Sequence, residues 1–403
     1  VTLNPVLTGD ANSRLVYKYI YESLLDMDND TLELKPNLAI RWEVSSDHLT
    51  YTFWLREDVR WHDGKPFTSE DVVFTFEKIR DPKVDAAALR NYFNDVTKVE
   101  SLGPYVVKFT YAKPYYKALG ILGGAAIIPK HIFDDGQDFN SHSANRAPIG
   151  TGPYRFIEWK TGRSVSLAKN NGYWREKPEI KGMEFDVISD QMVAFEMLKK
   201  GALDLVSLNP IQWAMQAGTK KIEEKNNKLR FFLPNYFFIA WNERTPFFSD
   251  RRVRIAMTEF IDRRSIIGKI LLGQGEMITN GFYRFGMVYD DSIEPYPFDP
   301  SHAARLLDES GWIDHDDDGI RDKDGTPFKF KFLSASGNKS GKDVGLFLSE
   351  ELSKVGIKME IVEMEAATMF DFVKRREFDA LSLGMMTPIE EDPYQVWHSS
   401  ESA

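Results

Sequence analysis

The fold of this chain is decided by residues 42–79, WEVSSDHLTYTFWLREDVRWHDGKPFTSEDVVFTFEKI. Apolar and polar side chains alternate over residues 49–56, which is the period of a half-buried strand. Asp63-Gly64 follows and gives the chain a turn in which a positive φ costs little. Thr68 or Ser69 then caps a helix with apolar residues on its inner face. The segment predicts a strand, a turn and a helix, and none of its residues looks catalytic.

The composition limits the classes of protein that this chain can belong to. With 403 residues it is too long for one hydrophobic core, so we expect two or three lobes. The formal net charge is −10 and no long block of lysine and arginine occurs, so nucleic acid is not expected as a partner. Cysteine is absent and the 7 histidines show no paired spacing, so we expect neither a zinc site nor a cofactor.

The C-terminal half of the chain alternates between strand and helix patterns. Strands are predicted near residues 329–333, 357–361 and 378–383, and helical periodicity separates them. Strands that are separated by helices favour parallel pairing, and the fold class is therefore α/β with an open sheet.

The middle of the chain carries further start and stop signals. Asp190 is predicted to cap a helix that stops at Gly201, and residues 203–206 are predicted to form a short strand. A second apolar run covers residues 236–240, and Ser249 is predicted to cap the helix with the clearest amphipathic pattern.

The segment 42–79 resembles, nearly position for position, the signature of the family 5 extracellular solute-binding proteins. These are the dipeptide-, oligopeptide- and nickel-binding receptors of ABC importers. Residues 3–25 and the Gly/Pro-rich run 149–154 resemble other parts of the same family, so the resemblance covers essentially the whole chain. It implies a periplasmic-binding-protein-like α/β fold, in which two α/β lobes surround a cleft and a smaller α+β lobe is inserted.

The resemblance also implies lobe boundaries and a location. Residues 1–26 and 147–244 correspond to lobe I, residues 27–146 to the inserted lobe II, and residues 245–403 to lobe III. Members of the family continue through a further C-terminal segment, so we expect lobe III to be incomplete here. We expect a protein that is periplasmic or anchored at the cell surface, with a signal segment that is not part of this chain.

The solute site is predicted from strand ends. In open α/β sheets, ligands bind beyond the carboxyl ends of strands, and pockets tend to lie between lobes. This rule selects residues 207–209, 241–242 and 384–387, and the family resemblance points to the same segments together with residues 10–13. We therefore predict these ligand-binding residues: Asn12, Ser13, Leu208, Asn209, Trp241, Asn242, Gly384, Met385, Met386 and Thr387.

The identity of the solute stays open at this point. Peptide-binding relatives carry an aspartate shortly after the glycine of the third segment, and it pairs with the ammonium group of the peptide. Here Thr387 and Pro388 occupy that stretch, and Glu390 or Glu391 could substitute only if the backbone took a different path. An unpaired buried ammonium group is costly. An oligopeptide held through its backbone therefore remains the first candidate, with an oligosaccharide or a metal chelate as alternatives.

Two other functional classes compete with the receptor. One is a cleft hydrolase, which the absence of HExxH and GxSxG motifs disfavours. The other is a sensory or chaperone-like protein that keeps the fold without feeding a transporter. We predict a monomeric receptor without catalytic residues, which closes on its solute by a hinge motion and delivers it to an ABC transporter permease.

An acidic turn at residues 314–325, DHDDDGIRDKDG, has the odd-position spacing of a calcium loop. The oxygen-bearing residues at these positions are Asp314, Asp316, Asp318 and Asp322. Position twelve, however, is Gly325 where calcium loops carry a bidentate glutamate. The sequence therefore favours a solvated acidic turn, and we predict no metal site.

Overall fold

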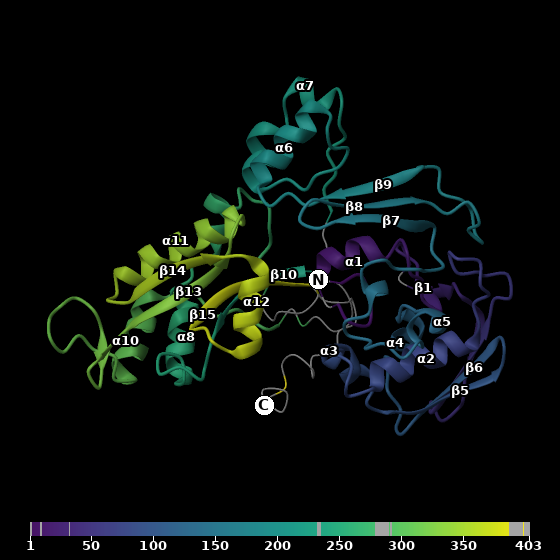
Figure 1. Cartoon of the computed structure of the whole chain (residues 1–403). Coiled ribbons are helices and arrows are strands. Elements are labelled where there is room, and N and C mark those ends of the chain that lie inside the picture. The colour runs from purple at the N-terminus through teal and green to yellow at the C-terminus, as the bar shows by residue number, and fades with distance from the viewer. Residues whose placement is uncertain are drawn as a thin grey trace. The chain divides into compact units, whose positions relative to one another are not determined.

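The computed structural model describes residues 2–8, 10–31, 33–231, 235–278, 290, 292–386 and 398. The chain divides into two compact units, Val1–Val187 and Ile188–Ala403 (Figure 1). The three-lobe division expected from the sequence, with residues 1–26 and 147–244 forming one lobe, stays a prediction.

The elements of unit 1 are α1 (Ala11–Tyr17), β1 (Leu25–Met27), β2 (Leu34–Pro36), β3 (Ala39–Val44), β4 (Thr50–Leu55), α2 (Ser69–Arg80), α3 (Ala87–Arg90), η1 (Asn91–Phe93), β5 (Val96–Gly103), β6 (Val106–Tyr111), α4 (Ala118–Gly124), α5 (Lys130–Phe133), η2 (Ser143–Asn145), β7 (Tyr154–Lys160), β8 (Ser164–Lys169) and β9 (Gly182–Asp186). Strands β3, β4, β6 and β5 form one antiparallel sheet in that order, and β7, β8 and β9 form another.

The segment 42–79 folds as its sequence predicts. Strand β4 alternates between half-buried and buried side chains, and Gly64 has a φ of 91° in the turn that follows. Thr68 caps α2 in a capping box, in which the side chain of Asp71 accepts a hydrogen bond from the Thr68 N–H (2.9 Å). Helix α2 packs against the sheet through Phe76, whose ring centroid lies 4.7 Å from that of Phe109 on β6.

The elements of unit 2 are α6 (Gln191–Lys200), η3 (Gln212–Gln216), α7 (Lys220–Glu223), β10 (Asn235–Trp241), α8 (Arg251–Glu259), α9 (Arg263–Ser265), η4 (Ile266–Ile270), α10 (Pro300–Glu309), β11 (Asp322–Lys323), β12 (Thr326–Pro327), β13 (Lys329–Ala335), α11 (Lys339–Ser353), β14 (Lys358–Met364), α12 (Ala366–Arg375) and β15 (Ala380–Met386). The main sheet has the described order β10-β15-β13-β14.

Parallel pairing is confirmed for the C-terminal strands of this sheet. Strand β13 pairs in parallel with both β14 and β15, because a helix connects each successive pair of these strands. Strand β10 pairs antiparallel with β15. Helices cover both faces of the sheet. Buried residues of α8, α10 and α11 pack on the face that carries Phe332, whereas Met369 of α12 packs with Leu333 on the other.

Two local predictions for unit 2 are wrong, and one is confirmed. Helix α6 begins after Asp190 and ends at Gly201, as predicted. The cap of α8 is Asp250 and not Ser249, because the Asp250 carboxylate accepts the hydrogen bond from Arg252 N–H (2.8 Å). Residues 203–206 form no strand. A strand needs a partner to satisfy its backbone, and this stretch has none among the described residues.

Candidate solute-binding site

The β10–β15 pair separates two of the predicted solute-binding segments. In the antiparallel register, Trp241 lies opposite Ala380, and Asn235 lies opposite Met386. The Trp241-Asn242 segment is therefore at one end of the strand pair, and the Gly384–Met386 segment is at the other. Carboxyl ends of strands meet at one edge of a sheet only when the strands are parallel, and β10 is antiparallel to β15. The structure does not bring these two segments together.

At the Met386 end, an aromatic ring lies directly on a glycine. Phe237 is opposite Gly384, and a Cβ at Gly384 would be 2.9 Å from Cε1 of Phe237, so any larger residue would require the ring to shift. Phe237 is 75% exposed. On the neighbouring register position, the buried Tyr236 donates a hydrogen bond from its hydroxyl to Sδ of Met385 (3.4 Å). This strand end presents an exposed aromatic face; Thr387 lies outside the described residues.

Trp241, a predicted anchor, packs against the core of unit 2. Its ring centroid lies 5.1 Å from that of Phe248 and 6.2 Å from that of Phe330. The side chain is half-buried, so one part of the ring supports the core and the rest reaches the surface.

Asn242 organises the loop that follows β10. Its Nδ2 donates to the carbonyl oxygens of Phe378 (2.7 Å) and Arg376 (3.2 Å), and its Oδ1 accepts from Arg244 N–H (3.1 Å). Its own backbone N–H donates to Asp379 O (2.8 Å). The side-chain amide therefore joins the loop after β10 to the turn before β15.

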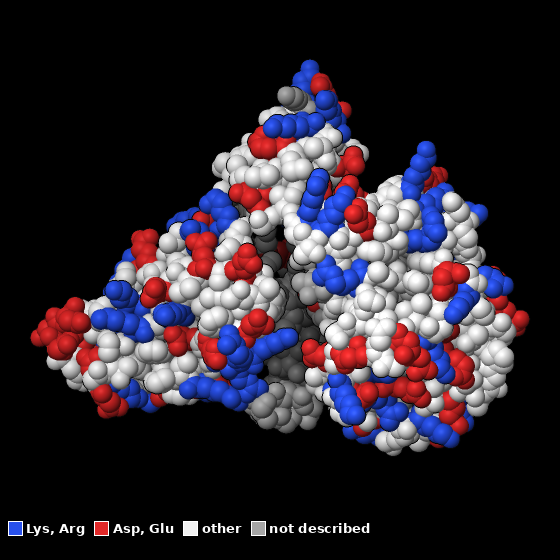
Figure 2. Space-filling view, in the orientation of Figure 1, with Lys and Arg blue, Asp and Glu red and all other residues white. Residues whose placement is uncertain are grey.

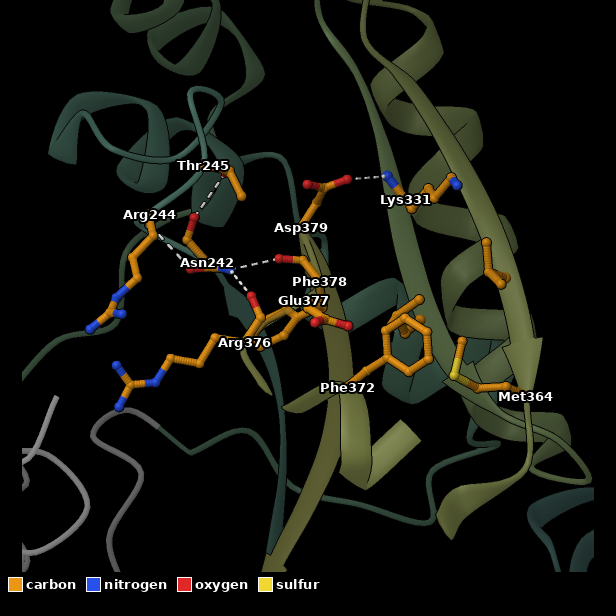
Figure 3. Close-up of a pocket in the computed structure, with 12 residues that line it drawn as sticks. Asn242, Arg244, Thr245, Lys331, Met364, Phe372, Arg376, Glu377, Phe378 and Asp379 are labelled. Carbon is orange, nitrogen blue, oxygen red and sulfur yellow. Dashed lines mark hydrogen bonds between the residues drawn. The ribbon is translucent and has the colours of Figure 1, made fainter. Parts of the chain in front are cut away.

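A cavity of about 480 Å³ lies beside Asn242 in unit 2 (Figure 3). Its lining residues are Asn242, Arg244, Thr245, Lys331, Leu333, Val362, Met364, Phe372, Arg376, Glu377, Phe378 and Asp379. Five of the twelve lining residues are apolar: Leu333 of β13, Val362 and Met364 of β14, Phe372 of α12, and Phe378 just before β15. The volume is within the range of small-molecule pockets.

Charged groups surround the mouth of this cavity. Figure 3 shows the guanidinium groups of Arg244 and Arg376 pointing to the same side, away from Phe372 and Met364. Arg376 ends α12 with a φ of 60°, a left-handed conformation that glycine usually adopts at this position. Lys331, Glu377 and Asp379 line the same cavity, so it carries charges of both signs beside the apolar wall. None of these charged residues stands in a recognisable motif, so the sequence analysis missed them.

The two predicted residues of unit 1 lie on the short helix α1. Asp10 caps this helix, and its Oδ1 accepts from the backbone N–H of Ser13 (2.8 Å). Burial alone would raise the pKa of Asp10, but hydrogen bonds from Ser13 and Thr8 outweigh it and lower the pKa. Ser13 is buried, whereas Asn12 is exposed.

Leu208 and Asn209 lie in unit 2, directly before the helical segment that begins at residue 210. Asn209 is buried, and it shares two reciprocal hydrogen bonds with Gln212, from Asn209 N–H to Oε1 (3.0 Å) and from Gln212 N–H to Oδ1 (2.9 Å). Leu208 packs on the small core around Phe195. Asn209 therefore begins the helical turn of η3, much as an N-cap residue does.

Buried ionisable groups of unit 1 hold the fold together. His62 does not form a dyad with Asp63. Its Nε2 donates to Gly152 O (2.9 Å) and its Nδ1 accepts from Gly150 N–H (3.2 Å). Asp63 instead contacts Nε2 of His131 at 2.7 Å. Burial lowers the pKa of His62 to about 4, so the ring is neutral at physiological pH.

Glu22 is the other buried ionisable group in this part of unit 1. Its carboxylate accepts hydrogen bonds from the Tyr173 hydroxyl (2.8 Å) and the Trp174 indole N–H (2.9 Å). Burial raises the pKa of Glu22, although these two donors oppose the rise. The carboxylate joins the strand β1 region to the loop after β8, which is a structural role.

Most of the chain matches a known protein family. A sequence profile of bacterial extracellular solute-binding proteins, family 5 middle, matches residues 33–403, so the chain belongs to this family. Members are transport receptors and not enzymes, which excludes the cleft hydrolase. The predicted family and the α/β fold class are confirmed.

Three relatives illustrate the range of this family. Oligopeptide-binding protein AppA of Bacillus subtilis strain 168 is 31% identical over 414 residues, which cover 99% of this chain and 74% of AppA. Its solved structure with a nonapeptide has a TM-score of 0.91 and 29% identity, covering 100% of this chain and 80% of that one. NikZ from Campylobacter jejuni, solved with Ni(L-His), has a TM-score of 0.90 and 29% identity, covering 100% of this chain and 78% of NikZ. Glutathione-binding protein GsiB of Salmonella paratyphi A is 28% identical, and the match covers 91% of this chain and 68% of GsiB.

Membership in the family sets the general role of the chain. It is a solute-binding receptor of an ABC importer, and receptors of this family act outside the cytoplasm and deliver their ligands to a transporter permease. Among the described residues, no helix is long and apolar enough to cross a bilayer.

Proposed function

We propose that the solute is an oligopeptide or a peptide-like compound. The single observation that carries this proposal is the likeness to AppA over the whole chain, at 31% identity in sequence and a TM-score of 0.91 in structure. AppA is described as an oligopeptide-binding protein and was solved with a nonapeptide.

The end of the β10–β15 pair supports a peptide ligand. Among the described residues, β13 pairs with β15 only at Ala380 and Leu381, so the edge of β15 beyond Leu381 can form hydrogen bonds with an extended peptide. The exposed ring of Phe237 offers a surface on which an apolar or aromatic side chain of the peptide can pack. The ten predicted ligand-binding residues stay part of this proposal, with Gly384 and Met385 as the main backbone contacts.

Recognition of the peptide should not depend on its free N-terminus. Thr387 and Pro388 stand where peptide-binding relatives have an aspartate that pairs with the ammonium group. We therefore expect a free peptide and its N-acetylated form to bind with affinities within about threefold of each other, because no buried ion pair is lost.

Isothermal titration calorimetry with defined peptides of two to nine residues tests the proposal. Phe237→Ala should weaken binding about fivefold, the size of one aromatic contact. Phe231→Ala is the matched control, because Phe231 is another highly exposed phenylalanine of unit 2. No heat of binding from any peptide would refute the peptide class. Equal losses in both variants would refute the role of Phe237.

A metal chelate is the second candidate, because NikZ was solved with Ni(L-His) at nearly the same structural similarity. Titration with nickel and histidine together distinguishes it from peptides. Hinge closure, delivery to a particular permease and a monomeric state belong to the same proposal. Small-angle scattering with and without ligand measures closure, and size-exclusion chromatography with light scattering measures the mass.

A further inference from the structure

An acidic turn outside the predicted solute site follows α10. Its sequence is DHDDDGIRD at residues 314–322, and a β-bridge closes it at the base. Ile313 N–H donates to Asp322 O (3.1 Å), and Asp322 N–H donates to Ile313 O (2.8 Å). Figure 2 shows acidic side chains gathered at this end of unit 2, next to the place of α10 in Figure 1. The base is fixed by the preceding Trp312, which is 2% exposed.

Carboxylate oxygens converge inside the turn. Asp314, Asp316 and Asp322 each offer one oxygen, and these oxygens all lie within 4.8 Å of one another. Asp316 is exposed and the other two are half-buried, so the turn gathers negative charge at one point, which favours a cation there. The three residues hold positions one, three and nine of the loop, and Gly319, with a φ of 84°, holds position six.

One oxygen of this group is buried without a hydrogen-bond donor. Gly319 N–H donates to Oδ2 of Asp314 (2.9 Å), which fixes the orientation of the carboxylate. The other oxygen, Oδ1, exposes less than 1 Å² and accepts no hydrogen bond from the residues that the structure describes. Burying a carboxylate oxygen without a partner is costly, and a bound cation would satisfy it.

We propose that this turn binds a calcium ion. Asp314, Asp316 and Asp322 supply carboxylate ligands, and Ile320 at position seven offers its backbone carbonyl, as in calcium loops. Water completes the coordination, because Gly325 at position twelve provides no side chain. The sequence predicted no metal here on account of that glycine. The inference does not depend on which solute the receptor takes.

The ligand chemistry selects calcium over other metals. All the converging side-chain ligands are oxygens, which hard cations prefer, and zinc favours nitrogen and sulfur. The Asp322 carboxylate also holds His315, whose Nδ1 lies 3.0 Å from Oδ1 and whose backbone N–H donates to Oδ2 (2.9 Å), so a bound ion would share this carboxylate. Magnesium demands octahedral geometry at short distances and keeps its waters, whereas calcium accepts a flexible loop of carboxylates. With few protein ligands, the dissociation constant should be about 0.1 to 1 mM.

The ion would stabilise the packing between the turn and the core. Arg321, inside the turn, donates from Nη1 to Trp312 O (2.6 Å) and from Nε to Val355 O (2.8 Å). It also forms an ion pair with Asp308 of α10. Arg321 therefore links the turn to α10 and to the end of α11, so calcium binding should raise the thermal stability of unit 2.

The test uses calcium chloride alone on protein stripped with a chelator. We expect one site by isothermal titration calorimetry, and a rise in Tm of about 3 °C at a free calcium concentration about tenfold above the dissociation constant. The same concentration of magnesium should give a smaller rise. Asp314→Asn and Asp316→Asn should each weaken calcium binding about tenfold, because affinity follows the number of charged ligands.

Asp324→Asn is the matched control, since it removes one carboxylate from the adjacent hairpin between β11 and β12 but not from the converging group. It should bind calcium like the unmodified protein. If Asp314→Asn fails to fold, the exposed Asp316 gives the same answer, and terbium luminescence excited through Trp312 reports occupancy of the unmodified protein. Absence of binding at 5 mM calcium at physiological ionic strength would overturn the proposal, as would equal loss in Asp324→Asn.

Discussion

The neutral, half-buried His62 makes the stability of unit 1 depend on pH in a defined range. Burial lowers the pKa of His62 from 6.5 to about 4 in the folded protein; a hydrogen bond to Gly152 opposes this effect without overcoming it. Between these two values the unfolded chain binds a proton that the folded chain does not. Stability from His62 is therefore complete above pH 6.5, falls as the pH drops, and reaches its minimum near pH 4.

The size of this effect follows from the pKa change. One pKa unit corresponds to about 1.4 kcal/mol, so a fall from 6.5 to about 4 is worth about 3 kcal/mol of unfolding free energy. His62→Gln removes the titration, whereas the amide can still donate to Gly152 O and accept from Gly150 N–H. The unfolding free energy of the unmodified protein minus that of this variant should fall by about 3 kcal/mol between pH 7 and pH 4.

Two measurements check this prediction. Urea unfolding at a series of pH values gives the difference in free energy, with His48→Asn as the control, because His48 is exposed. NMR titration of the His62 ring proton gives the pKa directly. A ring that titrates near 6.5, or a free-energy difference that stays constant from pH 7 to pH 4, would refute the reasoning.

Three further changes give sharp expectations. Gly150→Ala would place a Cβ 1.8 Å from Ile20 O, so thermal denaturation should show that the protein loses about 3 kcal/mol or more of stability. Gly120→Ala is the control: with nothing within 4 Å of its Cβ, it should gain about 0.5 to 1 kcal/mol of stability. A Gly150→Ala variant as stable as the unmodified protein would contradict the close approach. Asn242→Ala should cost about 2 kcal/mol by urea unfolding, because it leaves backbone carbonyls without donors, and no loss would mean that water replaces the amide. Phe332→Ala, at a fully buried position, should cost about 3 to 5 kcal/mol in the same assay, and a loss below about 1 kcal/mol would show that the core collapses around it.

The candidate site shows where sequence reasoning ends. The sequence predicts a strand at residues 378–383, and the structure has β15 at Ala380–Met386, which extends past Gly384. The partner of Gly384 is not visible in the sequence, because Phe237 lies 147 positions earlier in an apolar run that resembles a core strand. The sequence near β10 likewise contains no signal that the strand runs antiparallel to β15. Whether the carboxyl ends of two strands lie together depends on whether the strands pair parallel or antiparallel, and only the tertiary structure shows that.

Local features were determined by the sequence itself. The strand β4, the turn at Gly64, the capping box of α2 and the ends of α6 depend on side chains within a few residues, so periodicity and capping rules find them. Only the tertiary structure decided that His62 binds the backbone of residues 150–152 and that Phe237 covers Gly384. These contacts join segments far apart in the chain, and their geometry is set by how whole elements pack, which no short stretch of sequence encodes.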